Sequence, residues 1–271
     1  MRDKKLLALV ESAIMIALAT VLSIFKIIDL PYGGSVTIAS MLPVAIIAYR
    51  HGLGWGIGSG FVYGVLQQLL GLNRLSWVTG WQSIVAVVLL DYIIAFTVIG
   101  FAGVFRKSIS NQAVGLSMGC LLACILRYAC HVVSGATVWA GLSIPTQDAL
   151  IYSFIYNATY MLPEAIVLIA AAMYIGSTID LRAAVPTRMY QKSEDKNTAW
   201  MLPVAGLSVV AAVVYDVVAI FAHLQDAETG EFTITNIAEV DWTSVIVVTA
   251  IGIIMAVALA CARNFSRKQK A

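Results

Sequence analysis

The run WQSIVAVVLLDYIIAFTVIGFAGVF, residues 81–105, contains one charged side chain in 25 residues, that of Asp91. An α-helix needs about 20 mainly apolar residues to cross the hydrocarbon core of a bilayer. The apolar residues are continuous here and lack the alternation that a lipid-facing β-strand requires. The run therefore predicts a transmembrane helix with a carboxylate inside it, and an intramembrane carboxylate needs a partner or a function.

Similar apolar runs occur along the whole chain of 271 residues. Hydrophobic residues make up 60% of it, charged residues only 12%, and the mean hydropathy is +0.87. So little charge cannot cover a water-soluble globule, and it excludes a disordered chain or a nucleic-acid-binding protein. We expect an all-α integral membrane protein. Its expected helices are 6–28, 36–49, 54–72, 81–105, 112–138, 149–175, 201–223 and 243–263.

A polar stretch divides the expected helices into two groups. It contains Gly176, Ser177 and Pro186, followed by the sequence QKSEDKN. We expect a core of six helices at 1–175, a cytoplasmic linker at 176–200, and an additional pair of helices with a basic tail at 201–271.

The basic residues predict the orientation in the membrane. With the N-terminus inside, 14 of the 17 Lys and Arg residues lie in segments that face the cytoplasm, whereas the last outside loop is acidic. Cytoplasmic segments carry an excess of Lys and Arg. We therefore expect a multi-pass protein of the cell membrane with both termini in the cytoplasm.

Four residues of the fifth helix recur every fourth position: Arg127, His131, Gly135 and Trp139. This spacing places a cation, an imidazole, a glycine gap and an aromatic plate on one slanting stripe. The stripe is either an interhelical hydrogen-bonding seam or a binding site, and we favour the site because ionisable groups inside lipid are costly.

The neighbouring helices add groups of complementary chemistry. Asp91, next to Tyr92, either pairs with Arg127 or receives a cationic ligand, and the two roles are compatible. The sixth helix opens with tyrosines, among them Tyr152, and with Asn157, whose amide suits the edge of a heterocycle. Glu164, after Pro163, is expected to bind backbone groups that the proline frees. Together these groups predict a site for a flat, cationic, amino-substituted heterocycle.

These segments resemble a known family. Leu-Leu-Asp-Tyr at 89–92, Leu-Arg-Tyr-Ala-Cys-His-Val-Val-Ser-Gly at 126–135 and Ile-Tyr-Ser-Phe-Ile-Tyr-Asn-Ala-Thr-Tyr-Met-Leu-Pro at 151–163 carry the resemblance. So does Pro-Tyr-Gly-Gly-Ser at 31–35. The chain is similar, over about residues 6–175, to the thiamine-specific substrate-binding (S) components of energy-coupling factor (ECF) vitamin transporters.

The resemblance implies a six-helix S-component bundle that encloses thiamine near the outer surface, with the pair of helices at 201–271 as a C-terminal extension. It implies thiamine as the transported ligand and an ECF module, a transmembrane coupling protein with two ATPase subunits, as the partner. The ligand-binding residues that it implies are Asp91, Tyr92, Arg127, His131, Gly135, Trp139, Tyr152 and Asn157.

The first helix carries the small-residue pair Ala13 and Ala17, which the resemblance assigns to docking on the coupling protein. Some family members have a tryptophan near Gly33-Gly34. We therefore expect Tyr32, Trp77 or Trp81 to close that side of the site. A second small-residue ridge, Gly56-Gly60-Gly64, is expected to pack internally.

Two other functional classes stay open. The residues Gly58-Ser59-Gly60 with His131 would suit an intramembrane serine hydrolase, although the Gly-x-Ser-Gly form of rhomboid proteases is not matched. Alternatively, Asp91, Glu164 or Asp216 could relay protons in an autonomous secondary transporter of thiamine or of a pyrimidine precursor. The sequence lacks a GxxxxGK[ST] phosphate-binding loop, so we expect no ATPase activity, no enzyme activity and no cofactor or metal.

Overall fold

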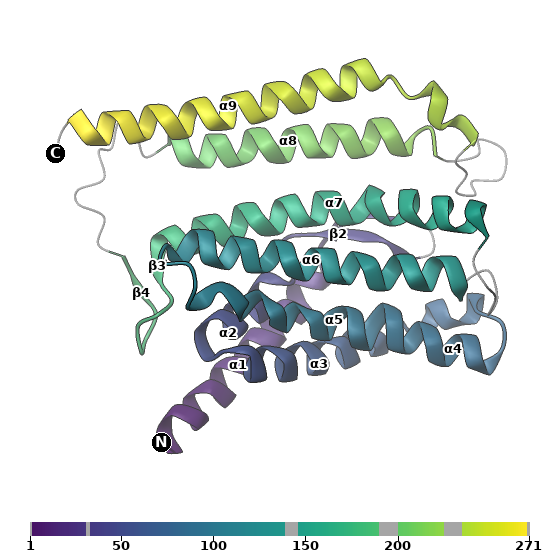
Figure 1. Cartoon of the computed structure of the whole chain (residues 1–271), viewed down its shortest axis with the longest axis horizontal. Helices are drawn as coiled ribbons and strands as arrows, with labels where there is room; N and C mark the ends of the chain where they lie inside the picture. Colours follow the sequence, from purple (N-terminus) through teal and green to yellow (C-terminus); the bar gives the residue numbers. More distant parts are fainter. Residues whose placement is uncertain (1, 31–32, 139–145, 190–199, 225–234, 270–271) are drawn as a thin grey trace. The chain divides into compact units, whose positions relative to one another are not determined.

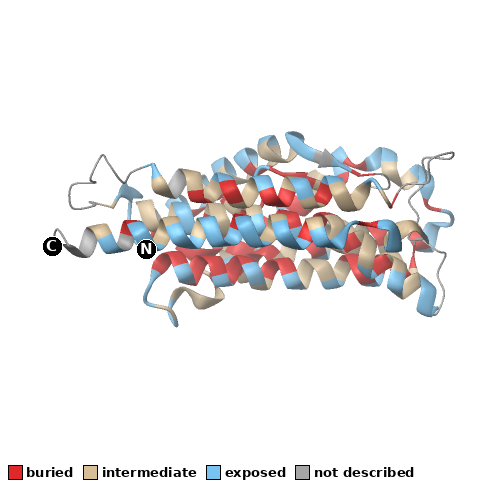
Figure 2. Ribbon diagram, turned by 90° about the horizontal axis from the view of Figure 1, so that it is seen from above, coloured by how far each residue is buried: buried red, intermediate tan, exposed pale blue. Residues whose placement is uncertain are grey.

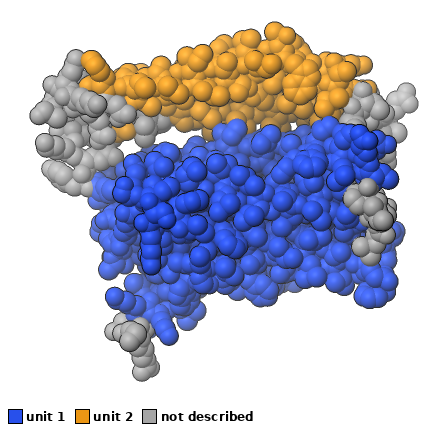
Figure 3. Space-filling model, in the orientation of Figure 1, with its two compact units in different colours: residues 1–189 blue, residues 190–271 orange. Residues whose placement is uncertain are grey.

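The computed structural model describes residues 2–30, 33–138, 146–189, 200–224 and 235–269. They form two compact units, residues 1–189 and residues 190–271 (Figure 3). Unit 1 contains α1 (Arg2–Ile24), β1 (Lys26–Asp29), β2 (Ser35–Thr37), α2 (Leu42–His51), α3 (Leu53–Leu70), η2 (Leu72–Trp77), α4 (Trp81–Val87), η3 (Val88–Ile94), α5 (Ala95–Thr97), η4 (Val98–Arg106), α6 (Gln112–Thr137), α7 (Gln147–Thr178), β3 (Ile179–Asp180) and β4 (Thr187–Arg188) (Figure 1). Unit 2 contains α8 (Met201–Phe221), η5 (Thr235–Glu239) and α9 (Trp242–Gln269).

The all-α membrane fold is confirmed. In the described residues, six helices are long and apolar enough to cross a bilayer. They are Lys4–Ile24, Trp81–Arg106, Gln112–Thr137, Gln147–Thr178, Val204–Phe221 and Trp242–Arg263. The expected helices at 36–49 and 54–72 correspond to α2, which has only 10 residues, and to α3. Exposed residues line the outer faces of the long helices, and buried ones gather on their inner faces (Figure 2).

The helix expected at 36–49 begins later than predicted, and the helix expected at 6–28 ends earlier. Between them, β1 and β2 pair antiparallel, so that Asp29 faces Ser35. The peptide N–H of Thr37 donates to the Glu164 carboxylate at 2.6 Å, which holds β2 against α7. Pro43 stands in the first turn of α2, where its missing N–H costs no hydrogen bond.

The run at 81–105 is continuous but not uniform. After α4 it widens into a π-helical turn, η3, which contains Asp91, and it tightens into the 3₁₀-helical η4. Glycines bring this run against its neighbours: a Cβ at Gly60 would lie 2.6 Å from the carbonyl oxygen of Phe96, and a Cβ at Gly64 would lie 2.8 Å from that of Tyr92. The ridge Gly56-Gly60-Gly64 therefore packs internally, as the sequence predicts.

A buried ion pair ties the first helices to the segment after α7. Arg50 on α2 donates to both carboxylate oxygens of Glu11 on α1, at 2.8 Å each. Its third nitrogen donates to the carbonyl oxygens of Leu181 and Ala183 at 2.9 and 3.2 Å. The expected core ended at residue 175, whereas unit 1 continues through β3 and β4 to Met189.

The second unit is held together by small and polar residues between α8 and α9. A Cβ at Gly252 would lie 2.7 Å from the Ala212 side chain, and the Ser208 hydroxyl donates to the Gly252 carbonyl at 3.3 Å. The Thr249 hydroxyl donates to the Asp216 carboxylate at 2.5 Å. Asp216 therefore has a pairing role between the two helices, in the way that polar groups commonly link helices within lipid.

Candidate ligand-binding site

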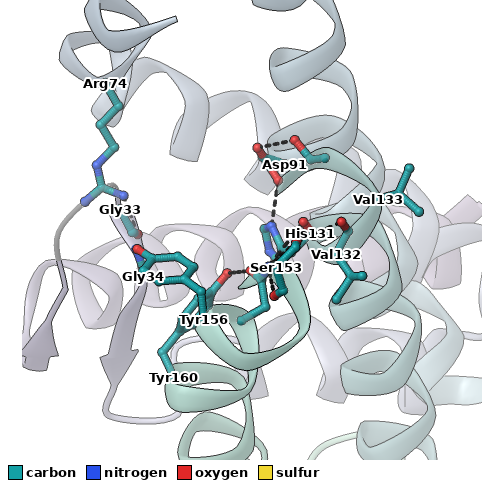
Figure 4. Close-up of polar contacts among 12 residues, drawn as sticks. Gly33, Gly34, Arg74, Asp91, His131, Val132, Val133, Ser153, Tyr156 and Tyr160 are labelled. Atoms are coloured by element: carbon teal, nitrogen blue, oxygen red, sulfur yellow. Dashed lines mark hydrogen bonds and ion pairs between the residues drawn. The ribbon is translucent and has the colours of Figure 1, made fainter. Parts of the chain in front are cut away.

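The centre of the candidate site is the Asp91 carboxylate on the π-helical turn. Oδ1 accepts a hydrogen bond from His131 Nδ1 at 2.8 Å, and Oδ2 accepts one from the Ser134 hydroxyl at 2.7 Å (Figure 4). The side chains of His131 and Asp91 are 10% and 13% exposed, and Ser134 is fully buried. Residues 131 and 134 are one helical turn apart on α6, so both face the same carboxylate.

The other ring nitrogen of His131 is unused. Nε2 is buried and has no hydrogen-bond partner among the described residues. An ionised Asp91 only accepts hydrogen bonds, so the proton of a neutral imidazole lies on Nδ1. Nε2 is then a bare acceptor, which can receive an N–H group from a ligand.

Aromatic rings of α7 continue from His131 toward the β1–β2 segment. The rings of His131 and Tyr160 have centroids 6.1 Å apart, and those of Tyr160 and Tyr156 are 5.8 Å apart. Tyr152 stacks on Tyr156 at 6.2 Å with an interplanar angle of 1°. These rings provide faces and edges suited to a flat heterocycle.

Gly34, between β1 and β2, lies against these rings. The Gly34 N–H donates to the Tyr156 hydroxyl at 3.2 Å, and Arg74 of η2 donates to the Gly33 carbonyl at 2.5 Å (Figure 4). A Cβ at Gly34 would lie 2.5 Å from the Tyr160 ring, so this approach requires glycine. Tyr32 and Trp139 lie outside the described residues, and Trp77 and Trp81 are 55% and 71% exposed.

Asn157 and Gly135 lie at the contact between α6 and α7, which run side by side (Figure 1). A Cβ at Gly135 would collide with the Ser153 hydroxyl oxygen. Asn157 Nδ2 donates to the Ser153 carbonyl at 2.8 Å, and Oδ1 accepts from the Tyr160 hydroxyl at 2.6 Å. Both residues therefore help to join the two helices behind His131, and their contact with a ligand stays a prediction.

Arg127 points away from Asp91, and Tyr92 contacts Arg74 of η2. Asp91 is hydrogen-bonded to His131, whereas the Arg127 guanidinium lies 4.3 Å from the centroid of the Phe96 ring and donates to the Met41 sulfur at 3.0 Å. The Tyr92 side chain extends toward the end of α3. Its hydroxyl would lie 2.5 Å from a Cβ at Gly71, the residue that follows this helix.

Glu164 has a different role from the expected one. Its carboxylate accepts from the Thr37 N–H and hydroxyl at 2.6 and 2.7 Å, instead of from backbone groups freed by Pro163. The reason is that Glu164 faces inward from α7, where it is 2% exposed and meets Thr37 at the end of β2.

Comparisons with known proteins agree with this architecture. A family model described as thiamine transporter protein (Thia_YuaJ) matches residues 9–182. The chain belongs to the thiamine transporter family. It is 37% identical to thiamine transporter ThiT of Bacillus subtilis (strain 168), over 61% of this chain and 88% of that protein. It is 28% identical to thiamine transporter ThiT of Lacticaseibacillus paracasei, over 58% of this chain and 80% of that protein.

A solved structure of ThiT from Listeria monocytogenes has a TM-score of 0.54 and 26% identity, and it covers 65% of this chain and 96% of that one. The family is one of transporters, so the function is transport and not catalysis. The alternative of an intramembrane serine hydrolase is excluded on the same ground.

Four residues that support the site were not predicted from the sequence as site residues. Ser134 had a usable signal, since it stands three residues after His131 and therefore shares its helix face. Arg74, Ser153 and Gly34 had none, because their contacts join segments that are distant along the chain.

Proposed function

We propose that the chain is the substrate-binding S component of an ECF-type transporter and that it captures thiamine from outside the cell. The observation that carries the proposal is the pairing of Asp91 with His131 and Ser134 beneath the β1–β2 segment. Thiamine joins a cationic thiazolium ring to an aminopyrimidine ring. A carboxylate shielded from water attracts the cation, and His131 Nε2 accepts an N–H of the amino group.

The tyrosines of α7 complete this proposed site. A cation over an aromatic ring gains about 1–2 kcal/mol once it is desolvated. We assign Tyr152, Gly135 and Asn157 to the side of the site formed by α6 and α7, and Trp139, which lies outside the described residues, to a stacking contact with the ligand. Arg127 is a longer-range electrostatic partner, because it lies one helical turn below His131.

Uptake against a gradient requires an energy source, for which we propose an ECF module of a coupling protein and two ATPase subunits. Ala13 and Ala17 are both exposed on α1, where their small side chains would permit close approach of another helix. We place both termini in the cytoplasm. The contacts of Arg50 and Arg182 gather the segments at 50–51, 106–109 and 181–184 at one end of unit 1, opposite the candidate site.

Titration calorimetry of purified protein with thiamine, in the absence of ATP, tests the binding role. We expect Asp91→Asn to lower the affinity for thiamine about tenfold or more, because the buried carboxylate that attracts the thiamine cation is lost. Asp148→Asn, which removes an exposed carboxylate from the first turn of α7, is the matched control. Equal affinities for wild type and Asp91→Asn would remove Asp91 from this role. Absence of thiamine binding by the wild type would contradict the proposed function.

A second candidate function is an autonomous proton-coupled transporter of thiamine or a related pyrimidine precursor. The observation in its favour is Asp216, whose Oδ1 is buried and has no partner among the described residues. Such a group inside a membrane helix is a candidate proton carrier. Uptake measured in cells that lack a coupling module decides: transport there favours the autonomous mechanism, and its absence favours the S component.

A further inference from the structure

The turn between β2 and α2 holds a buried residue in an unfavourable backbone conformation. Ala39 has a φ of 53°, and among the described residues it is the only one with a positive φ that is not a glycine. This left-handed conformation is rare for residues that carry a Cβ, and it persists only where the surrounding structure holds it. Ala39 is 5% exposed. The turn at residues 37–41 therefore depends on contacts from the rest of the bundle.

The two helices that carry most of the candidate site supply such contacts. From α7, the Glu164 carboxylate accepts from the Thr37 N–H at 2.6 Å and from the Thr37 hydroxyl at 2.7 Å. From α6, Arg127 donates to the Met41 sulfur at 3.0 Å. Sulfur is a weak acceptor, so the carboxylate makes the stronger contact. Thr37 is 5% exposed, and leaving its N–H without an acceptor would be costly.

One face of α7 connects this turn with the ligand site. Tyr156, Tyr160 and Glu164 recur at four-residue spacing, which places them on one side of the helix. Gly34, the residue before β2, donates its N–H to the Tyr156 hydroxyl at 3.2 Å, and a Cβ there would lie 2.5 Å from the Tyr160 ring (Figure 4). Thr37 ends the same strand and meets Glu164. A displaced turn would therefore shift β2 along α7 and move Gly34 relative to the rings.

We propose that Glu164 is a positioning residue for the ligand site, which holds the turn at Ala39 and thereby fixes β2 beside the tyrosines of α7. The proposal rests on the proposed function, because thiamine affinity is its readout. Glu164 acts through Thr37 and does not contact the ligand. Without the carboxylate, the Thr37 N–H is buried and unpaired, so the turn leaves its strained conformation to find another acceptor. Gly34 then loses its place against the rings, and ligand binding weakens.

The first test compares two substitutions of Glu164 in the full-length chain. Glu164→Met keeps the side-chain length and removes both acceptors of Thr37. Glu164→Gln is the conservative variant: its oxygen accepts from the Thr37 N–H, and its NH₂ group donates to the Thr37 hydroxyl, which can also accept. By titration calorimetry, we expect Glu164→Met to weaken thiamine binding about tenfold or more. Glu164→Gln should bind thiamine within about threefold of the wild type.

A glycine at position 39 separates positioning from packing. Glycine adopts a positive φ without strain, so with Ala39→Gly the turn keeps its conformation when the carboxylate is absent. We expect Glu164→Met with Ala39→Gly to recover about threefold or more of the lost thiamine affinity, and Ala39→Gly alone to bind like the wild type. The matched control is Glu164→Met with Ala45→Gly. It removes a methyl group from a fully buried residue of helix α2 and should recover no affinity.

Thr37→Val tests the same contact from the other side and serves if Glu164→Met does not fold. It keeps the shape of the side chain and the N–H bond to Glu164, but it removes the hydroxyl bond. We expect it to weaken thiamine binding about threefold or more, and Ala39→Gly to restore the affinity in this background as well.

Unchanged thiamine affinity in Glu164→Met and Thr37→Val would overturn the proposal and leave the proposed function intact. Affinity equally low in Glu164→Gln and Glu164→Met would assign the effect to the charge of Glu164 and overturn it too. The same holds if Ala39→Gly recovers no more affinity than Ala45→Gly, because Glu164 would then act through packing. A wild type that fails to bind thiamine would overturn the proposed function itself.

Discussion

Ser134 illustrates how one hydroxyl can control a carboxylate. It is fully buried and donates to Asp91 Oδ2 at 2.7 Å, while His131 holds the other oxygen. A hydrogen bond to a charged group contributes about 1.5–3 kcal/mol. We expect Ser134→Ala to let the carboxylate rotate and to lower thiamine affinity about tenfold, as measured by calorimetric titration.

Ser117 provides the control for that variant. It stands on the same helix, and its buried hydroxyl has no partner among the described residues. Ser117→Ala should therefore leave thiamine affinity unchanged. If the two alanine variants bind equally well, Ser134 does not position Asp91.

Gly135 is required by the contact between two helices. A Cβ at this position would collide with the Ser153 hydroxyl, which donates to the Val132 carbonyl at 2.9 Å. Overpacking of a tight contact costs about 1–3 kcal/mol. We expect Gly135→Ala to lower the free energy of unfolding by that amount, measured in detergent with chemical denaturant.

A double variant separates overpacking from a loss of ligand contact. Ser153→Ala removes the colliding oxygen, so Gly135→Ala with Ser153→Ala should recover part of the lost stability. Additive losses in the double variant would contradict a collision between these two residues.

Sequence reasoning found Asp91 and His131 because ionisable groups are rare and costly inside apolar runs. Sequence reasoning left open whether Asp91 pairs with Arg127 or receives a ligand. Which residue of α6 faces Asp91 depends on the π-helical turn η3, and residue spacing does not reveal such a turn. The internal bonds of Asn157 were equally hidden. They depend on where Tyr160 and Ser153 face once α7 packs against α6.

At the scale of elements, the longest apolar runs were located within a few residues, because hydrophobicity alone determines that they cross the membrane. The strands β1 and β2 were missed. Residues 26–29 and 35–37 continue the apolar pattern of their neighbours, and their pairing is stabilised by a contact from α7, far along the chain.

Arg74 of η2 secures the segment that follows β1. Besides its bond to the Gly33 carbonyl, its guanidinium lies 3.7 Å from the Asp29 carboxylate. We expect Arg74→Leu to raise the dissociation rate of thiamine severalfold, because the segment over Tyr156 and Tyr160 loses an anchor. Stopped-flow measurement of intrinsic fluorescence would show this. Lys26→Leu, which also removes a partner of Asp29 but no bond to Gly33, should dissociate at the wild-type rate.

The start of α9 depends on pH. Asp241 precedes the helix, and hydrogen bonds from the side chain and the backbone N–H of Ser244 hold the pKa of Asp241 below its ordinary value of 3.8. A lowered folded-state pKa means that the ionised form stabilises the cap above the ordinary pKa, and that this contribution is lost as the pH falls through the folded-state pKa. We expect the protection of the first-turn amides of α9 against hydrogen exchange to decrease as the pH falls from 3.8 through the lowered pKa of Asp241.

Asp241→Asn keeps an oxygen acceptor for the cap but cannot titrate. Its first-turn protection should therefore lack the acidic step, as measured by hydrogen exchange with mass spectrometry. A step of equal size in this variant would assign the pH dependence to another group.

At the scale of the whole molecule, the family match and the candidate site both lie within unit 1, since the match covers residues 9–182. The two units differ in how they are held together. Unit 1 buries charged groups such as Arg50 and Glu164 with several partners each, whereas α8 and α9 meet through small residues and the Asp216–Thr249 bond. The sequence indicated this division by its polar stretch, but it placed the end of the core 14 residues before Met189. It could not show that Arg50 anchors the segment after α7.

Transport by the whole molecule requires that binding and partner docking be separable, and α1 allows a direct test. Ala13 and Ala17 are exposed and take no part in the hydrogen bonds of Asp91 with His131 and Ser134. We expect Ala13→Leu with Ala17→Leu to keep wild-type thiamine affinity in the purified protein but to abolish thiamine uptake by cells that contain the coupling module, because larger side chains prevent close helix approach. Leu18→Phe, a bulky change at a position that is 44% exposed and about 100° or more around α1 from both alanines, should preserve uptake. Uptake by the double leucine variant at the wild-type rate would show that the module docks elsewhere.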